Sequence, residues 1–196
     1  MVKVVFNISM SLDGFVAGPN DEVDRIFRWY FSGDTEFPFP GTDMVFKVSE
    51  PSAAHLQQGT KTIGAAITGR RNFDIAHAWG GKPPVGVHHF VITHNPPPEW
   101  VKEGSPFTFV TDGVESAVNK AKQTAGNKDV VVSSPNILQQ CLRAGLIDEI
   151  HIDLVPILLG NGVRLFDHLG SEPIELEAIE VIDAPGVTHL GFRVVK

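Results

Sequence analysis

The chain has 196 residues, a net charge of −7 and one cysteine, so it is long enough for one domain with a substantial core. Acidic and basic residues are mixed, without the basic stripe that nucleic-acid binding requires. The first apolar run is too short to span a membrane and lacks a signal-peptide cleavage region. The lone Cys141 excludes an intramolecular disulfide, which is typical of a reducing cytosol. We therefore expect one cytoplasmic domain over residues 1–196, with no nucleic-acid or membrane partner.

Strands and helices alternate along most of the sequence. Apolar and β-branched runs predict strands at 2–8, 62–68, 88–93, 107–110, 129–132, 147–155, 174–181 and 188–195. Capping residues and breakers predict helices at 22–30, from Ser49 onward, and at 70–79, 114–125 and 134–144. Asp112 is expected to cap the helix at 114–125, with Glu115 completing a capping box. The pattern predicts an α/β fold with a mostly parallel sheet, helices on both faces and an antiparallel C-terminal strand pair.

The first candidate site is the turn Gly69-Arg70-Arg71-Asn72, where a predicted strand ends and a helix begins. Free N–H groups at a helix start favour an anion, and guanidinium groups add charge-assisted contacts to phosphate. The alternative is an ordinary helix start, but two arginines at the positive end of the helix dipole need an anion or an acidic partner. The turn therefore favours phosphate binding.

The second candidate site is the turn that begins with Ser133, Ser134 and Pro135, again between a strand and a helix. Both hydroxyls could bond a phosphate oxygen, whereas the alternative is that Ser134 simply caps the helix. Thr93 and His94 follow a third strand. In open parallel sheets ligands gather at the carboxyl ends of strands, so these three turns are expected at one edge.

A glycine-containing loop from Ser9 to Gly18 is the third candidate, since glycine allows close backbone approach to a ligand or a moving lid, although turn geometry alone also explains it. The eight histidines form no ligand spacing, and His88 and His89 point to opposite faces of a strand, so no metal is assigned. Cys141 is interpreted as a small apolar residue inside a helix rather than a nucleophile.

Three stretches then resemble one family: Ser11-Leu12-Asp13-Gly14-Phe15-Val16-Ala17-Gly18, the Gly69–Phe73 turn, and Gly145–Ile150 followed by Val155–Gly162. They resemble the bacterial dihydrofolate-reductase-like proteins, which are also described as the C-terminal reductase domain of the riboflavin-biosynthesis deaminase-reductase. The resemblance runs in order from Val2 to Val195. It implies a three-layer α/β/α fold, NADPH as hydride donor, and a homodimer to which the terminal strands and the Leu158–Gly162 loop contribute.

The resemblance also implies which residues hold the cofactor. The backbone at Ile8 and Ser9 would meet the nicotinamide carboxamide, and Val16, Ala17 and Gly18 would form a flexible loop beside it. Phosphates would bind at Gly69, Arg70, Arg71 and Asn72, and the adenosine ribose with its 2′-phosphate near Thr93 and His94. The pyrophosphate would lie on the turn Ser133, Ser134, Pro135, Asn136, Ile137 and Leu138.

The sequence departs from the family pattern at that last turn. Relatives generally have two glycines where this chain has Ser133 and Ser134, followed by Pro135, which lacks an N–H. Either the hydroxyls replace the close backbone approach or the affinity for the cofactor is reduced.

The substrate side is less defined in the sequence. Folate reductases carry an acid on their first helix, and the candidates here are Asp21, Glu22, Asp24, Asp34, Glu36 and Asp43. Asp13 is the candidate catalytic residue, although an Asp before Gly is also a common turn former. Trp29, Tyr30, Phe31 and Phe37 either wall the substrate pocket or belong to the core.

Two functions remain open on this sequence. The first is an NADPH-dependent reductase that transfers a hydride to a small pteridine-like, pyrimidine-like or carbonyl substrate. The alternative is a non-catalytic nucleotide-binding or dimerisation module that keeps the fold without turnover. A riboflavin-pathway reductase acting alone is a weaker reading, because the zinc motif of the deaminase half is absent.

Overall fold

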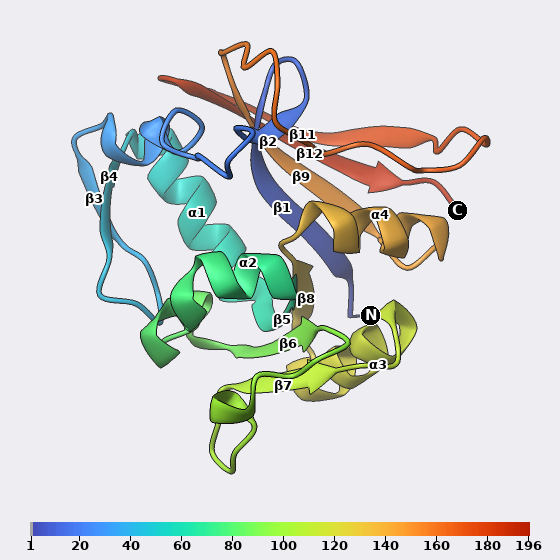
Figure 1. Ribbon diagram of the computed structural model, residues 1–196. Helices are drawn as coiled ribbons and strands as arrows, with labels where there is room; N and C mark the ends of the chain where they lie inside the picture. Colours follow the sequence, from blue (N-terminus) through green and yellow to red (C-terminus); the bar gives the residue numbers. More distant parts are fainter. Residues whose placement is uncertain (1) are drawn as a thin grey trace.

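An eight-stranded sheet forms the centre of the computed structural model, which describes residues 2–196 (Figure 1). Its strands lie in the order β11-β12-β9-β1-β8-β5-β6-β7. They are β1 (Val4–Ser11), β5 (Ile63–Gly69), β6 (His88–Ile92), β7 (Phe107–Val110), β8 (Asp129–Val132), β9 (Glu149–Val155), β11 (Leu176–Ala184) and β12 (Val187–Val194). The pairs from β9 through β7 are parallel, whereas β12 is antiparallel to both β9 and β11. The predicted sheet is therefore confirmed.

Helices cover both faces of the sheet, as predicted. The helices are α1 (Glu50–Thr62), α2 (Arg70–Ile75), α3 (Val114–Ala125) and α4 (Pro135–Arg143). The buried faces of α3 and α4 share one apolar cluster with Phe6 and Ile152, which includes the fully buried Cys141. On the other face, Leu56 of α1 belongs to a second cluster with Val155, and Phe73 of α2 to a third. No helix within residues 2–196 is both long and apolar enough to cross a membrane.

Several predicted element ends were wrong, for local reasons. Gly113, with φ +99°, takes the N-cap position of α3, so the predicted Asp112 cap does not form. The helix predicted at 70–79 ends at Ile75, because residues 77–80 turn into left-handed backbone. The N-cap of α1 is as predicted: the Ser49 hydroxyl accepts the Ser52 N–H at 3.4 Å.

The segment before α1 differs most from the prediction. Only Arg28–Phe31 is helical within the predicted 22–30 helix, as one turn of 3-10 helix. Two hairpin strands follow, β3 (Thr35–Pro38) and β4 (Val45–Val48), and neither was predicted. A second small pair, β2 (Phe15–Ala17) with β10 (Val163–Arg164), joins the loop after β1 to a distant loop near the C-terminus. These short strands have too few residues to show a periodic pattern.

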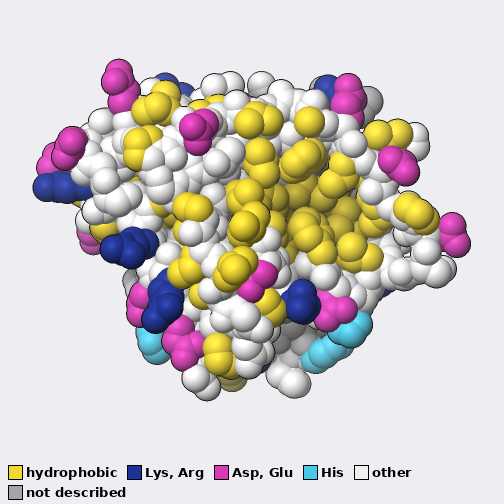
Figure 2. Space-filling model, turned by 90° about the horizontal axis from the view of Figure 1, so that it is seen from above, with side chains coloured by type: hydrophobic (Ala, Val, Ile, Leu, Met, Phe, Trp, Pro, Cys, Tyr) yellow, Lys and Arg dark blue, Asp and Glu magenta, His cyan; other side chains and the backbone are white. Residues whose placement is uncertain are grey.

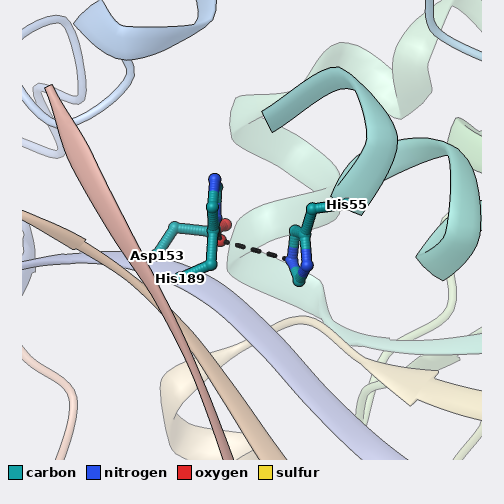
Figure 3. Close-up of side chains that lie close together, drawn as sticks. All are labelled: His55, Asp153 and His189. Atoms are coloured by element: carbon teal, nitrogen blue, oxygen red, sulfur yellow. Dashed lines mark hydrogen bonds and ion pairs between the residues drawn. The ribbon is translucent and has the colours of Figure 1, made fainter. Parts of the chain in front are cut away.

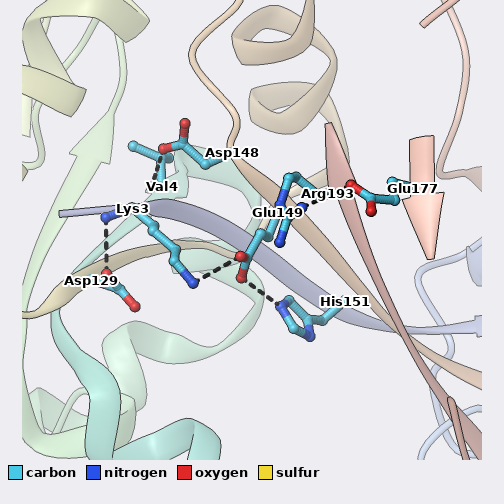
Figure 4. Close-up of polar contacts among 8 residues, drawn as sticks. All are labelled: Lys3, Val4, Asp129, Asp148, Glu149, His151, Glu177 and Arg193. Atoms are coloured by element: carbon cyan, nitrogen blue, oxygen red, sulfur yellow. Dashed lines mark hydrogen bonds and ion pairs between the residues drawn. The ribbon is translucent and has the colours of Figure 1, made fainter. Parts of the chain in front are cut away.

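A polar network ties together the amino ends of the central parallel strands (Figure 4). The Lys3 ammonium contacts Glu149 at 2.8 Å, and the backbone N–H of Lys3 donates to Asp129 at 2.9 Å. Asp148 accepts the Val4 N–H at 2.8 Å. The opposite, carboxyl edge is the one where sheets of this kind bind ligands. We therefore assign this network to stability.

Candidate functional site

The two candidate phosphate turns meet at the carboxyl edge, where β5 and β8 are neighbours. The Ser134 hydroxyl accepts the Gly69 N–H at 2.9 Å and lies 3.0 Å from the Thr68 hydroxyl. Thr68 in turn accepts a hydrogen bond from the Asn72 side chain at 2.9 Å. A single polar chain therefore joins the end of β5, the start of α2 and the start of α4.

Ser134 stands at the N-cap position of α4 but makes no side-chain cap. Its side chain is turned toward β5 and is 5% exposed, so the hydroxyl is engaged within the protein. The Ser133 hydroxyl makes a weaker contact, because it lies 3.5 Å from the Ile67 carbonyl oxygen. The interpretation of Ser134 as an ordinary side-chain helix cap is therefore wrong.

Both arginines of the first turn already have acidic partners. Arg70 donates through Nε to both oxygens of Asp74, at 2.8 and 2.9 Å, and also reaches the Asn95 carbonyl. Arg71 forms a two-pronged contact with Asp21, at 2.7 and 3.2 Å, and its side chain is 74% exposed. An exposed ion pair contributes little stability, so a phosphate that competes for either guanidinium meets a small cost.

The turn after β6 lies beside Arg70. Gly69 pairs with Ile92, which places the carboxyl ends of β5 and β6 next to each other. The Asn95 carbonyl that contacts Arg70 also accepts a hydrogen bond from the Thr93 hydroxyl at 3.3 Å. The structure thus brings Arg70 together with the Thr93-His94 turn, and Arg71 together with the loop that contains Gly18 and Asp21.

The predicted lid lies in ordered, buried structure. Val16 and Ala17 are 5% and 7% exposed in β2, rather than part of an open loop. The backbone of Gly162 packs directly against β2. A Cβ at this position would lie 2.0 Å from the Ala17 carbonyl oxygen, so only glycine fits. Ile8 and Ser9 lie inside β1, paired with Ile152 and Asp153 of β9.

Asp13 fastens two loops to each other. Its carboxylate accepts the Ser11 hydroxyl at 2.6 Å and the Leu159 and Gly160 N–H groups at 3.1 and 2.7 Å. The Ser11 hydrogen bond, followed by these backbone bonds, lowers the pKa of Asp13 to about 2. Such a carboxyl holds no proton at neutral pH, so this geometry favours a positioning role, while a direct catalytic role stays a prediction.

The acidic candidates on the substrate side are scattered over the surface. Asp21 pairs with Arg71, Glu22 with Asn20, and Asp43 with Lys82, while Asp24, Asp34 and Glu36 are exposed. Of the aromatic candidates, Trp29 and Phe37 are core residues, and Tyr30 packs against them. Phe31 is 66% exposed and lines a groove of about 560 Å³ along the same segment.

A buried polar group beneath that segment was missed by the sequence analysis (Figure 3). Ser9, Asp153 and His189 lie side by side across β1, β9 and β12, because Asp153 pairs with both of the others. They are 1%, 1% and 0% exposed. α1 places Ser52 and His55 against them from above.

The geometry of this group is specific. His189 Nδ1 lies 2.7 Å from Asp153 Oδ1, and its Nε2 lies 2.9 Å from the Ser52 hydroxyl. His55 stacks on His189 with ring centroids 4.3 Å apart, and its Nδ1 lies 3.2 Å from Glu180. Burial lowers the pKa of His55.

The roof over this group is the Arg28–Phe31 helix. Trp29 donates its indole N–H to the Ser9 hydroxyl at 3.0 Å, and the Trp29 and Tyr30 rings stack with centroids 3.9 Å apart. Burial of the Tyr30 hydroxyl raises its pKa. Polar residues at buried positions, such as Asp153 in the apolar strand HIDLV, were the available sequence signal.

Together, the sheet order and these contacts define an α/β protein with polar groups gathered at the carboxyl ends of its parallel strands. Residues 2–188 match the family model described as the RibD C-terminal domain, and the chain belongs to this family. That domain is a reductase domain of riboflavin biosynthesis and is NADPH-dependent in general.

Solved structures confirm the dihydrofolate-reductase-like fold. A putative riboflavin biosynthesis protein from Shewanella sp. PV-4 is 20% identical, with a TM-score of 0.76 over 100% of both chains. A Thermotoga maritima diaminohydroxyphosphoribosylaminopyrimidine deaminase/5-amino-6-(5-phosphoribosylamino)uracil reductase is 12% identical, with a TM-score of 0.66 over 99% of this chain and 57% of that one. The chain therefore corresponds to about half of that bifunctional protein.

Two curated relatives come from Bacillus subtilis (strain 168), and both are described as uncharacterised. YyaP is 23% identical over 184 residues, covering 84% of this chain and 80% of the relative. YwjB is 24% identical over 177 residues, covering 87% and 86%. These relatives match most of the chain without adding an activity.

Proposed function

We propose that this chain is an NADPH-dependent reductase that transfers a hydride to a small pteridine-like, pyrimidine-like or carbonyl substrate. The observation that carries the proposal is the carboxyl edge of the sheet, where Arg70, Arg71 and the Thr93-His94 turn gather in a chain of the RibD C-terminal domain family. The family's dependence on NADPH supports the choice of cofactor. The geometry of this edge supports where the phosphates would bind.

The residues at the edge fit such a cofactor. The side chain of Arg71 is mostly exposed and its partner Asp21 is on the surface, so the guanidinium can exchange a carboxylate for a phosphate. Arg70 lies beside the Thr93-His94 turn, where a 2′-phosphate would add charge-assisted hydrogen bonds. When bound, the reduced nicotinamide supplies the hydride. The backbone of β1 around Ile8 and Ser9 would orient it.

The test is oxidation of NADPH in the presence of small pyrimidine, pteridine and carbonyl compounds, followed by absorbance of the reduced nicotinamide. We expect oxidation with at least one class and little with NADH. Wild-type protein that oxidises NADPH with none of these compounds, although it binds the cofactor, would contradict the reductase assignment.

A second candidate function is a nucleotide-binding module without turnover. The contact between Ser134 and Gly69 favours it, because the hydroxyl that could replace the family's glycine backbone is already bonded within the protein. Tight NADPH binding without turnover would support this second function over the first.

We also propose that the chain forms a homodimer through the face of the sheet that α1 does not cover. Val181 pairs with Leu190, which pairs with Ile152, so an apolar row crosses β11, β12 and β9 on that face. Val181 is 65% exposed and Ile179 38%. Figure 2 shows a broad apolar area, hollowed at its centre, on the side that carries the C-terminal strands in Figure 1. A second copy would bury this area.

A further inference from the structure

A chain of hydrogen bonds leads from the start of α1 to the centre of the buried polar group. The Ser49 and Ser52 hydroxyls are 3.0 Å apart, and Ser52 Oγ is 2.9 Å from His189 Nε2. His189 Nδ1 is 2.7 Å from Asp153 Oδ1. Ser49 is partly exposed, whereas the other three residues are at most 1% exposed. These hydrogen bonds therefore connect the surface to a carboxyl group in the interior.

The hydrogen-bonded chain ends at a buried carboxyl group with one unpaired oxygen. Asp153 Oδ2 is buried and has no hydrogen-bond partner among the described residues. A buried carboxyl oxygen without a donor is costly when charged, and such exceptions are rare enough to need an explanation. A proton held on this oxygen, or a ligand group that bonds to it, removes the cost.

We propose that Asp153 is the proton donor to the substrate, and that His189, Ser52 and Ser49 form the relay that reloads it from solvent. The proposal rests on the proposed reductase function, because reduction of a C=N or C=O group needs a proton as well as a hydride. Hydroxyl and neutral imidazole groups each accept one proton and donate another, so every member of the chain can pass a proton on. General acid catalysis of this kind typically contributes about 10²–10⁴-fold in rate.

The step balances without a further reactant. The substrate carbon takes the hydride, and its nitrogen or oxygen takes the proton from Asp153 Oδ2. Oδ1 then takes the proton of His189 Nδ1, Nε2 takes the Ser52 hydroxyl proton, and Ser52 takes the Ser49 proton. Water replaces the proton of Ser49 and leaves hydroxide in solvent. Rotation of the Asp153 carboxyl group then carries the protonated oxygen to the Oδ2 position, and rotation of both hydroxyls with a change of the His189 tautomer restores the starting arrangement.

His55, Asp153 and His189 could also be considered as metal ligands, since one ligand atom of each lies within 4.8 Å of the others. The geometry favours a relay. A metal lies in the plane of each imidazole that binds it, but the rings of His55 and His189 are stacked with an interplanar angle of 22°. Both nitrogens of His189 are also engaged, one by Asp153 and the other by Ser52.

Several titratable groups and one helical turn surround the proposed relay. The titratable groups that face Asp153 and His189 are Tyr30 from the roof, His55 from α1, His151 from β9 and Glu180 from β11. The roof is one turn of 3-10 helix, held to the sheet by the hydrogen bond between Trp29 and Ser9. Because Asp153 is 1% exposed, the proposal requires that this turn move aside for a substrate to reach Oδ2.

The experiment compares wild type with Asp153→Asn and Ser52→Ala. Asn keeps the shape and can still accept from His189, but it has no acidic proton to transfer. We expect Asp153→Asn to bind NADPH within about twofold of wild type while its rate of NADPH oxidation falls about 100-fold or more. Ser52→Ala should lose about 10-fold in kcat with little change in KM, and Ser52→Thr, which keeps the hydroxyl, should recover most of it.

Thr60→Ala is the matched control, because among the described residues the Thr60 hydroxyl bonds carbonyls of its own helix alone, those of Leu56 and Gln57. Its kcat and KM should equal those of wild type. Circular dichroism melting verifies that each variant is folded.

Each result decides the proposal. A wild type that binds no NADPH refutes the reductase function and the relay together. A wild type that binds NADPH but reduces no compound overturns the donor assignment and leaves the binding module. Turnover in folded Asp153→Asn equal to wild type refutes the relay alone. Stabilisation of wild type by Zn²⁺, lost in His55→Ala, would overturn the relay in favour of a metal site.

Discussion

Replacing Ser134 by alanine tests the contact that joins the two phosphate turns. The substitution removes the acceptor of the Gly69 N–H and the partner of the Thr68 hydroxyl. A buried donor left without its partner costs about 1–3 kcal/mol, so we expect a loss of about 2 kcal/mol in the free energy of unfolding. For a chain of this length that lowers Tm by roughly 4–8 °C.

The assay is urea unfolding followed by circular dichroism, with Ser133→Ala as the matched control. Within residues 2–196 the Ser133 hydroxyl makes one long contact, 3.5 Å from the Ile67 carbonyl oxygen, and its loss should cost less than about 0.5 kcal/mol. If both variants lose the same small amount of stability, the Ser134 hydroxyl does not hold the turns together and the reasoning is refuted.

Three further predictions concern the edge, the loop and the dimer. Arg71→Ala should weaken the binding of both NADPH and NADH by about 1.5–3 kcal/mol. Arg70→Ala, which removes a side chain beside the Thr93 turn, should weaken only the binding of NADPH. Equal losses of both nucleotides in titration would contradict this division. Because the pKa of Asp13 is lowered from 3.8 to about 2, its contribution to stability is present above about pH 4 and lost toward pH 2. Acid unfolding of Asp13→Asn should therefore show a smaller change over that range than wild type, and identical curves would remove Asp13 from the account. Val181→Asp should sediment as a monomer at micromolar concentration while wild type sediments as a dimer, so a monomeric wild type would rule the interface out.

The sequence predicted the sheet well, because long apolar strands and their helices carry periodic signals that local chemistry reinforces. β7, α3 and β8 match the predicted bounds, and the Ser49 cap forms as expected. The segment around Trp29 was mispredicted, because its shape follows from burial of aromatic rings against the sheet rather than from a helical period. Tertiary packing of this kind leaves no local pattern.

Some parts of the candidate site could be predicted from the sequence and others could not. The turns that begin at Gly69 and Ser133 could be located from strand-to-helix transitions, and register then brought them together. The partners of Arg70 and Ser134 could not be predicted, because each contact depends on how neighbouring strands align. The same is true of Asp153 and His189, which are 36 residues apart and meet only through the pairing of β9 with β12.

The central claim is that the carboxyl edge of this sheet binds NADPH. Titration with NADPH and, separately, NADH, followed by the fluorescence of the reduced nicotinamide, tests it most directly. The account predicts saturable NADPH binding that is clearly tighter than NADH binding, because only NADPH carries the 2′-phosphate that would lie beside Arg70. No saturable binding of either nucleotide would contradict the account.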